Sequence, residues 1–430
     1  MSGAFDDRLA INDLVVSVIG LGYTGLPLAL SFAAAGVPTI GFDLDQRKVA
    51  ALGAGVSYLP DITDREVKSV TGNFTATTDP GVLSGADAYL ICVPTPLADD
   101  CTADLRYVDS ATDAIAASLR RGDLVIVQST VPPGTTAAVA ARLAAATGLA
   151  AGRDFHIAMV PERIDPAAGH QWTVRNTPKL VGGLTPECGR RAQLLFSRVV
   201  ETVVPCASPA AAETAKVFEN TFRLVNIALT YELADLCRPL GITPREVIDA
   251  AATKPFGFLA HFPGPGVGGE CVPVDPMFLR TTAARNGMTM SLVETAHRHV
   301  RRRPMQVVDR LTELLRAEGS DLAGSRVLVV GVAYKPGVSD TRNAPGLDII
   351  RELRRRAAKP RYCDPLVSDL VIDDDPVERI EWDRVSVSDH DCVVLVTPHE
   401  PILKRPLWYA VPLVLDTWHL LPGGDGVHHL

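Results

Sequence analysis

The fold is decided by residues 14–45, LVVSVIGLGYTGLPLALSFAAAGVPTIGFDLD. A run of β-branched residues leads into a glycine-rich turn, an alanine-rich segment follows, and after a second glycine another apolar run ends at Asp43. A strand, a helix and a second strand in this order make one parallel βαβ unit. The stretch therefore predicts the start of a doubly wound α/β sheet.

The turn GLGYTG, residues 20–25, has the spacing of a dinucleotide-binding fingerprint. Its glycines permit a tight turn and let a pyrophosphate approach the helix N-terminus. Asp43 can accept hydrogen bonds from ribose hydroxyls and repels a 2′-phosphate, so the pattern favours NAD over NADP, although Arg47 lies nearby. A tight turn without a ligand is the alternative. We expect NAD contacts here at Gly20, Gly22, Tyr23, Thr24, Gly25, Asp43 and Arg47.

Three further strand patterns follow, AYLICVPTP at 88–96, LVIVQSTVPPG at 124–134 and FHIAMV at 155–160. The first two end in loops that place Pro94, Thr95 and Thr130 at the carboxyl edge of the sheet, where ligands bind in open α/β folds. Ordinary loop-forming residues would give the same pattern. After the third strand, PERIDP presents Glu162 and Arg163, and the acid could act as a base, hold a water or cap a helix.

The composition changes after about residue 206, where a long helical pattern, apolar at three- and four-residue steps, runs to Gly241. From residue 325 the chain again predicts strand, turn and helix, with strands at PRYCDP, DCVVLVTP and LVLDTW. Only Gly331 remains there of a dinucleotide fingerprint, and Lys335 occupies the turn, so this half should bind substrate or close the cleft. We predict an α/β fold of two doubly wound Rossmann-like domains, 1–205 and 319–430, joined by a long central helix within a region spanning 206–318.

Charge and cysteine content exclude several classes of protein. The net charge of −8 at pH 7 argues against a nucleic-acid partner, and the one basic run, HRHVRRRP at 297–304, fits a solvated helix face or a subunit contact better. No apolar run of about 18 residues occurs and the first residues are acidic, so we expect a cytoplasmic protein with no membrane partner. The eight cysteines lack zinc or disulfide spacing, so we predict no metal and mostly buried thiols.

One cysteine stands in a different setting, FPGPGVGGECVPVDPMFL at 262–279. Prolines and glycines crowd around Cys271, which suggests backbone placed close to a small ligand, although a buried thiol is the alternative. On the long helix, Lys216 and Asn220 are four residues apart and share a face. Lys216 and Glu219 could equally form exposed charge.

The chain resembles, over nearly its full length, the UDP-glucose/GDP-mannose dehydrogenase family. The resemblance runs in the family's order through GLGYTGLP, CVPTP, STVPPGT, PER, AETAKVFENTFRLVNIAL, GPGVGGECVPVDP and GVAYKPGVSDTR. It implies a cytoplasmic homodimer, formed through the central helices, that oxidises the C6 alcohol of a UDP-sugar to a carboxylate with two NAD. The motifs ATKPFGF, PGPGVGG and CVPVDP further resemble the UDP-N-acetyl-D-glucosamine and UDP-N-acetyl-D-mannosamine 6-dehydrogenase branch, since the UDP-glucose branch would have lysine at Val274. A role in polysaccharide biosynthesis would follow.

The resemblance implies roles for matching residues. Cys271 would attack the C6 aldehyde and carry a thiohemiacetal and then a thioester. Lys216 and Asn220 would stabilise the oxyanion, while Asp275 and Glu162 would handle protons and the hydrolytic water that Thr130 helps to position. Arg342 would lie at the cofactor. The substrate contacts implied are Glu162, Arg163, Lys216, Asn220, Arg223, Gly268 and Lys335.

Several positions depart from the family's pattern, and they leave the exact sugar open. Glu270 replaces the branch's histidine beside Cys271, and such a carboxylate would raise the thiol's pKa unless it points away. The other departures are Ala167, Val300, Arg303, Asn343, Ala344 and Trp418. UDP-glucose or another nucleotide sugar is the alternative substrate. A silent NAD-binding protein and an alcohol dehydrogenase that stops at the aldehyde are the alternative functions.

Overall fold

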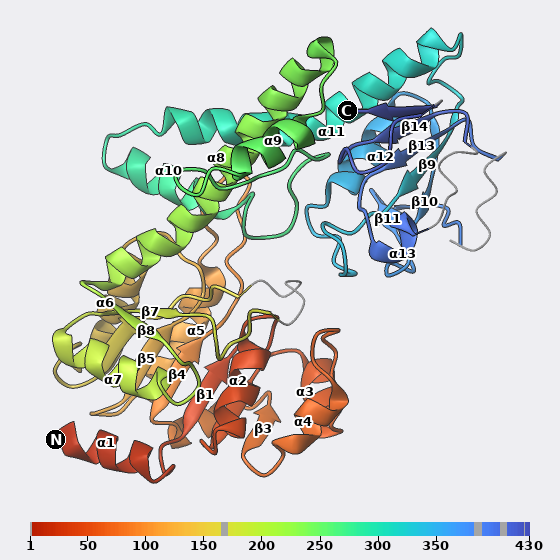
Figure 1. Cartoon of the computed structure of the whole chain (residues 1–430). Coiled ribbons are helices and arrows are strands. Elements are labelled where there is room, and N and C mark those ends of the chain that lie inside the picture. The colour runs from red at the N-terminus through yellow and green to blue at the C-terminus, as the bar shows by residue number, and fades with distance from the viewer. Residues whose placement is uncertain (1, 165–170, 382–388, 405–410, 425) are drawn as a thin grey trace. The chain divides into compact units, whose positions relative to one another are not determined.

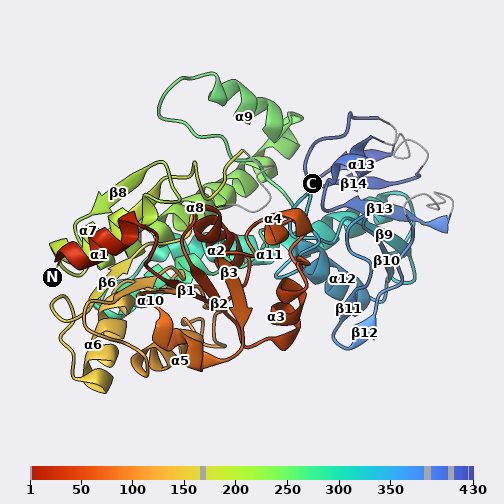
Figure 2. The ribbon, with the colours of Figure 1, turned by 90° about the horizontal axis from the view of Figure 1, so that it is seen from below.

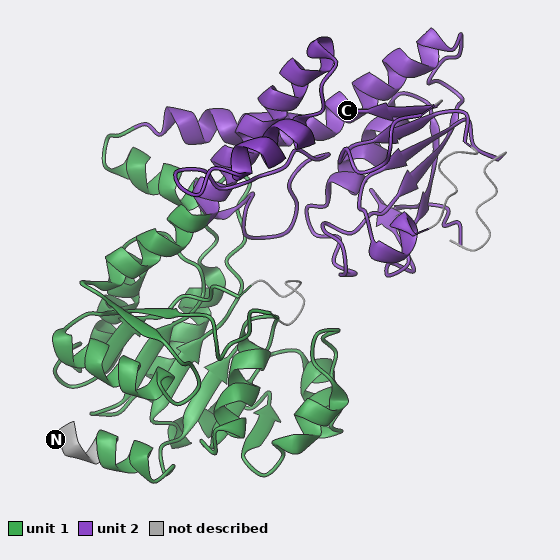
Figure 3. Ribbon diagram, in the orientation of Figure 1, with its two compact units in different colours: residues 1–219, 277–288 green, residues 220–276, 289–430 purple. Residues whose placement is uncertain are grey.

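The structure is a computed structural model that describes residues 2–164, 171–381, 389–404, 411–424 and 426–430 (Figure 1). It divides into two compact units, coloured separately in Figure 3: residues 1–219 with 277–288, and residues 220–276 with 289–430. The expected boundaries of three domains stay a prediction. Ala167, one of the departures, lies outside the described residues.

Unit 1 is built on one eight-stranded sheet with the order β3-β2-β1-β4-β5-β6-β7-β8. Its strands are β1 (Val16–Ile19), β2 (Thr39–Phe42), β3 (Phe74–Thr77), β4 (Ala88–Ile91), β5 (Leu124–Val127), β6 (His156–Met159), β7 (Lys179–Gly183) and β8 (Val203–Cys206). The first six are parallel, as predicted. The parallel order ends at β7, which pairs antiparallel with β6. An antiparallel neighbour needs no crossover helix, whereas a parallel one does.

Helices cover both faces of this sheet. The helices of the unit are α1 (Ser2–Ala10), α2 (Gly25–Ala34), α3 (Gln46–Gly53), α4 (Asp64–Ser69), α5 (Arg106–Ala116), α6 (Thr135–Thr147) and α7 (Pro186–Phe196), with a 3₁₀ turn at Pro80–Gly85. Alternate strand residues point to opposite faces, so Val18 and Leu90 pack with α1, α2 and α7, whereas Ile19 and Ile91 pack with α5 and α6. Figure 2 shows these two helix layers on either side of the strands.

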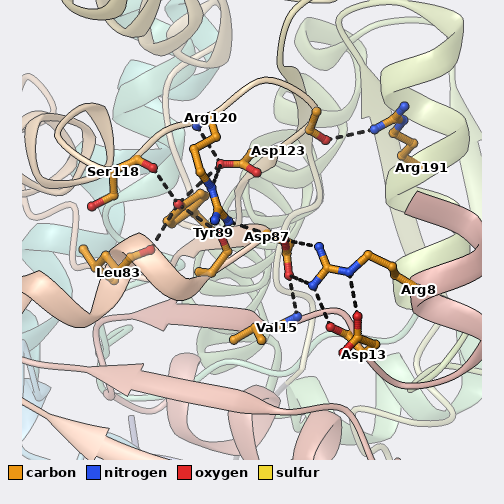
Figure 4. A network of polar contacts seen from close by, with 12 residues as sticks. Arg8, Asp13, Val15, Leu83, Asp87, Tyr89, Ser118, Arg120, Asp123 and Arg191 are labelled. Atoms are coloured by element: carbon orange, nitrogen blue, oxygen red, sulfur yellow. Dashed lines mark hydrogen bonds and ion pairs between the residues drawn. The ribbon is translucent and has the colours of Figure 1, made fainter. Parts of the chain in front are cut away.

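A network of arginines and acids fixes the amino edge of this sheet, at the ends of the strands opposite to the carboxyl edge (Figure 4). Arg8 donates to both carboxylate oxygens of Asp87, at 2.6 and 2.8 Å, and Asp87 also accepts from the Val15 backbone N–H at 2.9 Å. Asp123, just before β5, accepts from the Arg120 backbone N–H at 2.7 Å. These charged groups hold the first residues of the strands in register, so their role is structural.

The predicted central helix is α8 (Pro209–Leu240), and it crosses the boundary between the units. It ends where expected, because Gly241 follows with a φ of +68° that favours glycine. Three more helices follow: α9 (Pro244–Ala252), α10 (Asp275–Arg285) and α11 (Ser291–Ala317). In unit 2, Leu224 and Tyr231 of α8 pack against Ala296 and Val300 of α11.

The basic run at 297–304 lies on α11, and the prediction of a solvated helix face or a subunit contact is wrong for Arg303, which is buried within its own chain. This side chain is 1% exposed, pairs with Asp235 at 3.0 Å and lies over the Tyr231 ring, 4.7 Å from its centroid. Its Nε also donates to the Gly264 carbonyl at 3.3 Å. Arg303 therefore joins two helices to the segment that leads to Cys271, because a buried guanidinium needs such partners.

Unit 2 contains a second parallel sheet with the order β10-β9-β13-β14-β15. Its elements are β9 (Arg326–Val330), α12 (Pro345–Arg355), β10 (Lys359–Cys363), β11 (Val371–Ile372), β12 (Asp375–Pro376), β13 (Cys392–Leu395), α13 (Glu400–Leu403), β14 (Val414–Asp416) and β15 (Val427–His429), with β11 and β12 forming a separate pair. The three strands predicted after residue 358 are confirmed.

The second half keeps more of the fingerprint than Gly331, contrary to expectation. Asp364 follows β10 as Asp43 follows β2, and each accepts a backbone N–H from the glycine turn of its own unit, Val332 at 2.8 Å and Leu21 at 2.8 Å. Asp364, however, is fully buried and is also paired with His399 at 3.1 Å. Asp364 therefore holds together the loops that contain Val332 and His399.

Candidate active site

The glycine turn of unit 1 is shaped for a phosphate group. Gly20 has a φ of +93°, and a Cβ there would lie 2.7 Å from the Cys92 carbonyl oxygen. A Cβ on Gly25 would lie 1.8 Å from the Gly20 carbonyl, which only glycine avoids. Nothing lies within 4 Å of a Cβ built on Gly22, so that backbone is open to a ligand. Thr24 immediately precedes α2, so the turn faces the positive end of a helix.

Asp43 lies where the fingerprint needs an acid, and its contacts include a lysine that sequence reasoning missed. It accepts from the Leu21 and Asp45 backbone N–H groups at 2.8 and 2.9 Å, and Lys48 Nζ lies 2.9 Å from Oδ2. Arg47, in contrast, is held by Asp45 at 2.9 Å and lowers the pKa of that carboxyl to about 2. Lys48 is therefore the cation at Asp43, and a cofactor contact for Arg47 stays a prediction.

The two proline- and threonine-rich loops are joined to each other. Thr95 Oγ1 donates to the Thr130 carbonyl at 2.6 Å, and Ser129 Oγ donates to the Val93 carbonyl at 2.6 Å. Both loops leave the carboxyl ends of adjacent strands, β4 and β5. The structure thus brings Pro94, Thr95 and Thr130 to one edge, as predicted.

Glu162 lies just beyond the end of β6 and carries an unexpected partner. Lys179 Nζ lies 2.6 Å from its Oε1, and the lysine side chain is completely buried. Burial alone would raise the pKa of Glu162, but the charge of Lys179 and the backbone N–H groups of Arg163 and Ile164 hold it below its ordinary value. Both backbone N–H groups that Glu162 accepts, those of Arg163 and Ile164, directly follow it in the chain.

Two further predicted residues of unit 1 are positioned by ion pairing or burial. Arg163 binds Glu219 of α8 at 2.6 Å and the Pro178 carbonyl at 2.8 Å. Lys216 is 8% exposed, so the alternative that it forms exposed surface charge with Glu219 is wrong. Asn220 lies one turn further along α8, on the same face.

Cys271 differs from most of the other cysteines in its exposure to solvent. It is exposed, while Cys92, Cys188, Cys237, Cys363 and Cys392 are buried, and none of the eight cysteines is in a disulfide. The alternative of a buried thiol at this position is therefore wrong. The Asp275 backbone N–H donates to the Cys271 carbonyl at 2.9 Å, which closes a turn at the start of α10. Asn220 Nδ2 donates to Asp275 Oδ2 at 2.5 Å, so an amide and a buried carboxylate meet beside the cysteine turn.

The residue before the cysteine is neutralised by an arginine. Glu270 Oε2 lies 2.5 Å from Arg342 Nη1, and Arg342 is also bound by Asp340 at 2.6 Å. The hydrogen bonds to Asp340 and the charge of Glu270 raise the pKa of the Arg342 guanidinium further above its ordinary value. Arg342 was expected at the cofactor; in unit 2 it is bound to the cysteine segment.

The cysteine segment is packed closely against the loop that follows β9. A Cβ on Gly268 would lie 2.7 Å from Tyr334 Cβ and 2.9 Å from the Asn343 carbonyl, so glycine is required there. The Gly269 N–H donates to the Arg342 carbonyl at 2.9 Å, and Asn343 Nδ2 donates to the Gly269 carbonyl at 3.0 Å. Lys335 lies in the same loop, with Nζ 5.2 Å from the Tyr334 ring centroid. Arg223 is exposed on α8.

The predicted catalytic residues fall into two groups. Thr130, Glu162 and Lys216 belong to unit 1, whereas Asn220, Cys271 and Asp275 belong to unit 2. Among the described residues, no group of His, Cys, Asp and Glu side chains could hold a metal ion. Across the same residues, no helix is long and apolar enough to cross a membrane.

A glycine turn for a dinucleotide, a second Rossmann-like sheet and an exposed cysteine beside an amide and an acid define an NAD-dependent oxidoreductase. Models of one family match the chain three times: the NAD binding domain at residues 14–200, the central domain at 210–300 and the UDP binding domain at 328–422. The chain belongs to the UDP-glucose/GDP-mannose dehydrogenase family. The residues of the GLGYTG turn fit NAD, which accepts the hydride in such enzymes.

Relatives of the chain have similar length and architecture. It is 35% identical over 400 residues to the UDP-N-acetyl-D-mannosamine dehydrogenase of Pyrococcus horikoshii, covering 92% of each chain. It is 37% identical over 406 residues to the enzyme of that name from Salmonella typhimurium, covering 91% of this chain and 95% of the other. A solved UDP-D-ManNAc dehydrogenase structure from Pyrococcus horikoshii superposes with a TM-score of 0.89 at 32% identity, covering 97% and 99%. The predicted fold and class of enzyme are confirmed.

Two residues of the site were missed by sequence reasoning, Lys48 and Lys179. Lys48 follows Asp43 by five residues on α3, and i to i+5 spacing is no recognised pairing signal. Lys179 opens β7 in TPKLVGG and lies 17 residues from Glu162. If β7 were parallel to β6, Lys179 would lie at the amino edge of the sheet, far from Glu162. The contact could therefore not be predicted without knowing that β7 is reversed.

Proposed function

We propose that the protein oxidises the C6 hydroxymethyl group of a UDP-N-acetylhexosamine to the uronic acid in two NAD-dependent steps. The names of its relatives support a UDP-N-acetylated hexosamine as substrate. The observation that carries the reaction is the exposed Cys271 in a turn closed by Asp275, whose carboxylate is held by Asn220. UDP-N-acetylmannosamine is the sugar we expect to be turned over fastest.

The first hydride transfer gives the C6 aldehyde, and the Cys271 thiolate then adds to its carbonyl carbon. The thiohemiacetal loses a second hydride to become a thioester, and water cleaves that thioester to the acid and the free thiol. Lys216, which is buried, and Asn220, which is partly buried, supply donors for the oxyanion, because preorganised donors stabilise developing charge more strongly than water does. Asp275 and Glu162 serve the proton transfers and Thr130 the placing of water. Arg163, Arg223, Gly268 and Lys335 serve substrate binding.

Mass spectrometry of products and of the protein tests this reaction. Wild-type protein and Cys271→Ser are incubated with NAD and a mixture of UDP-sugars that includes UDP-glucose. We expect a uronic acid and two NADH for each sugar from the wild type, and an ester-linked adduct on the serine of the variant. One NADH for each sugar would indicate an enzyme that stops at the aldehyde. No product from any acetylated sugar would overturn the proposed substrate, and no product at all would favour a silent binding protein.

We also propose a cytoplasmic homodimer formed through α8. Phe222, Leu229 and Leu236 recur at seven-residue steps on this helix, and their exposed fractions are 43%, 62% and 58%. Seven residues are about two helical turns, so the three side chains share one face. An apolar stripe of this kind on a helix marks a contact with another protein surface. Eight cysteines without a disulfide between them are consistent with a reducing compartment.

A further inference from the structure

The ion pair between Lys179 and Glu162 depends on the reversal of one strand. Because β7 is antiparallel to β6, its first residue lies at the sheet edge where β6 ends. Lys179 is that first residue, and Glu162 follows β6 by three residues. The lysine is completely buried, and its Nζ reaches Glu162 Oε1 at 2.6 Å. A lysine is almost never buried unless it is paired, so the contact points to a specific use of this charge.

The hydrogen bonds to Glu162 are distributed unequally between its two oxygens. Oε1 receives Lys179 Nζ at 2.6 Å and the backbone N–H groups of Arg163 and Ile164 at 2.7 and 3.0 Å. Oε2 receives Gln128 Nε2 at 3.0 Å. A carboxylate oxygen accepts about two hydrogen bonds, so Oε1 is saturated while Oε2 can still accept from a water. The side chain is 12% exposed, which leaves it reachable.

The other charged or titratable groups around Glu162 do not replace Lys179. The Arg163 guanidinium is occupied by Glu219 and by the Pro178 carbonyl. Burial, and then the charge of Glu162, raise the pKa of the Cys92 thiol, so that group is neutral. Burial would also raise the pKa of Glu162 itself, and the charge and hydrogen bond of Lys179, followed by the backbone N–H groups of Ile164 and Arg163, reverse that effect. Lys179 is therefore the cation that does most to hold the pKa of this acid below its ordinary value.

We propose that Lys179 is a positioning residue for thioester hydrolysis, which keeps Glu162 ionised and saturates Oε1 so that Oε2 receives the proton of the attacking water. This inference rests on the proposed function. In the step, the water oxygen bonds to the thioester carbon, the carbon–sulfur bond breaks, and the water proton passes to Oε2. Sulfur leaves as the Cys271 thiolate, and no oxidant is consumed. A protonated Glu162 could not accept that proton.

The variant Lys179→Met tests the role through the pH dependence of hydrolysis. Without the ammonium group, burial dominates and Glu162 becomes neutral at higher pH. We expect the acidic limb of kcat to move upward by at least about one pH unit, with a loss of about tenfold or more at pH 6 that recovers toward pH 9. Mass spectrometry should detect the thioester on Cys271 at pH 6 in this variant, and less of it as pH rises. Lys179→Arg keeps the positive charge, so the acidic limb of its kcat profile should lie at the same pH as in the wild type.

Two controls separate a positioning role from loss of folding. Glu162→Gln/Lys179→Met removes both buried charges; it should fold as well as the wild type and accumulate thioester at every pH. Lys68→Met removes an exposed lysine of the same unit and should leave the profile unchanged. A Lys179→Met profile that is lowered equally at all pH values, with no movement of the acidic limb, would overturn the proposal.

A titration without turnover distinguishes this inference from the proposed function. The carboxyl carbon of Glu162 is followed by ¹³C NMR in wild type and Lys179→Met, and its signal is assigned by its loss in Glu162→Gln. A higher pKa in Lys179→Met with no NADH from any nucleotide sugar would uphold the pair and refute the proposed reaction. An unchanged pKa would refute the pair whether or not a sugar is oxidised.

Discussion

Glu270 and Arg342 form an ion pair, with Oε2 and Nη1 2.5 Å apart, directly beside the proposed nucleophile. A carboxylate at this position was expected to oppose ionisation of the thiol. The ion pair counters that effect, because the Glu270 carboxylate faces the positive charge of Arg342. Three other departures from the family's pattern touch the same segment: Arg303 binds the Gly264 carbonyl, the Trp418 ring meets Gly264 and Asn343 binds the Gly269 carbonyl. The departures therefore act together to hold the segment that carries Cys271.

Removing either charge of this pair should change the reactivity of Cys271, in opposite directions for the two residues. In the wild type, Arg342 lies between two carboxylates, Glu270 and Asp340. Glu270→Gln removes a negative charge near the thiol, and Arg342→Gln removes the positive one. We expect the thiol pKa to fall in the first variant and to rise in the second, each by about half a unit to one unit. The rate of alkylation by iodoacetamide against pH measures it.

The background of this experiment comes from Cys271→Ser, because Cys101 and Cys206 are also partly exposed. Subtracting its alkylation leaves the signal of Cys271 alone. If the pKa of the Cys271 thiol is the same in both variants as in the wild type, the ion pair does not control that pKa. Its role is then limited to anchoring the segment.

Asp43 should determine the choice of cofactor together with Lys48. Asp43→Ser removes the acceptor for the ribose hydroxyls and frees Lys48, which lies 2.9 Å from it, to meet a 2′-phosphate. We expect kcat/KM for NAD to fall about tenfold to a hundredfold, as for the loss of a charged hydrogen bond, and kcat/KM for NADP to rise. Initial rates with both cofactors give the ratio. Asp45→Asn, which changes the neighbouring acid that holds Arg47, is the control, and an equal change there would assign the preference to Arg47 instead.

The GLGYTG turn, the end of α8 at Gly241 and the three strands after residue 358 could be read from sequence, because each depends on local signals of glycine or apolar period. The residues around Cys271 were also reached, since Asp275 is only four positions away. Lys179 and the Glu270 to Arg342 pair were not, because they depend on a strand reversal and on a contact between residues 72 positions apart. The prediction for Arg303 was wrong for the same reason. It rested on the charged neighbours in sequence, whereas the burial of Arg303 results from the packing of the helices.

Asp123 should make stability depend on pH in a direction opposite to that of most acids. Burial raises its pKa to about 6, so between pH 4 and pH 6 the folded protein binds a proton that the unfolded chain has released. The contribution of this group to stability is therefore present at low pH and lost as pH rises through 6. An asparagine cannot ionise, so Asp123→Asn avoids the loss of stability that ionisation of the buried carboxyl causes. We expect the variant to be more stable than the wild type by about 1 kcal/mol at pH 7, after allowing for solvent screening, and by less at pH 4.

Thermal unfolding of both proteins from pH 4 to pH 8 measures this difference. Asp113→Asn is a matched control of opposite sign, because Arg142 lowers the pKa of Asp113 and that contribution is lost on acidification. A difference between Asp123→Asn and the wild type that stays constant with pH would refute the assigned titration.

The apolar stripe of α8 should be needed for assembly. Leu229→Glu places a charge at the centre of the stripe formed with Phe222 and Leu236, and burying it against a second chain costs several kcal/mol. We expect light scattering after size exclusion to give a dimer for the wild type and a monomer for the variant, with little change in the folded spectrum. Ile11→Glu, at a side chain that is 74% exposed in unit 1, should remain dimeric. A dimeric Leu229→Glu would mean that the chains associate through another face, and a monomeric wild type would leave the stripe to a different partner.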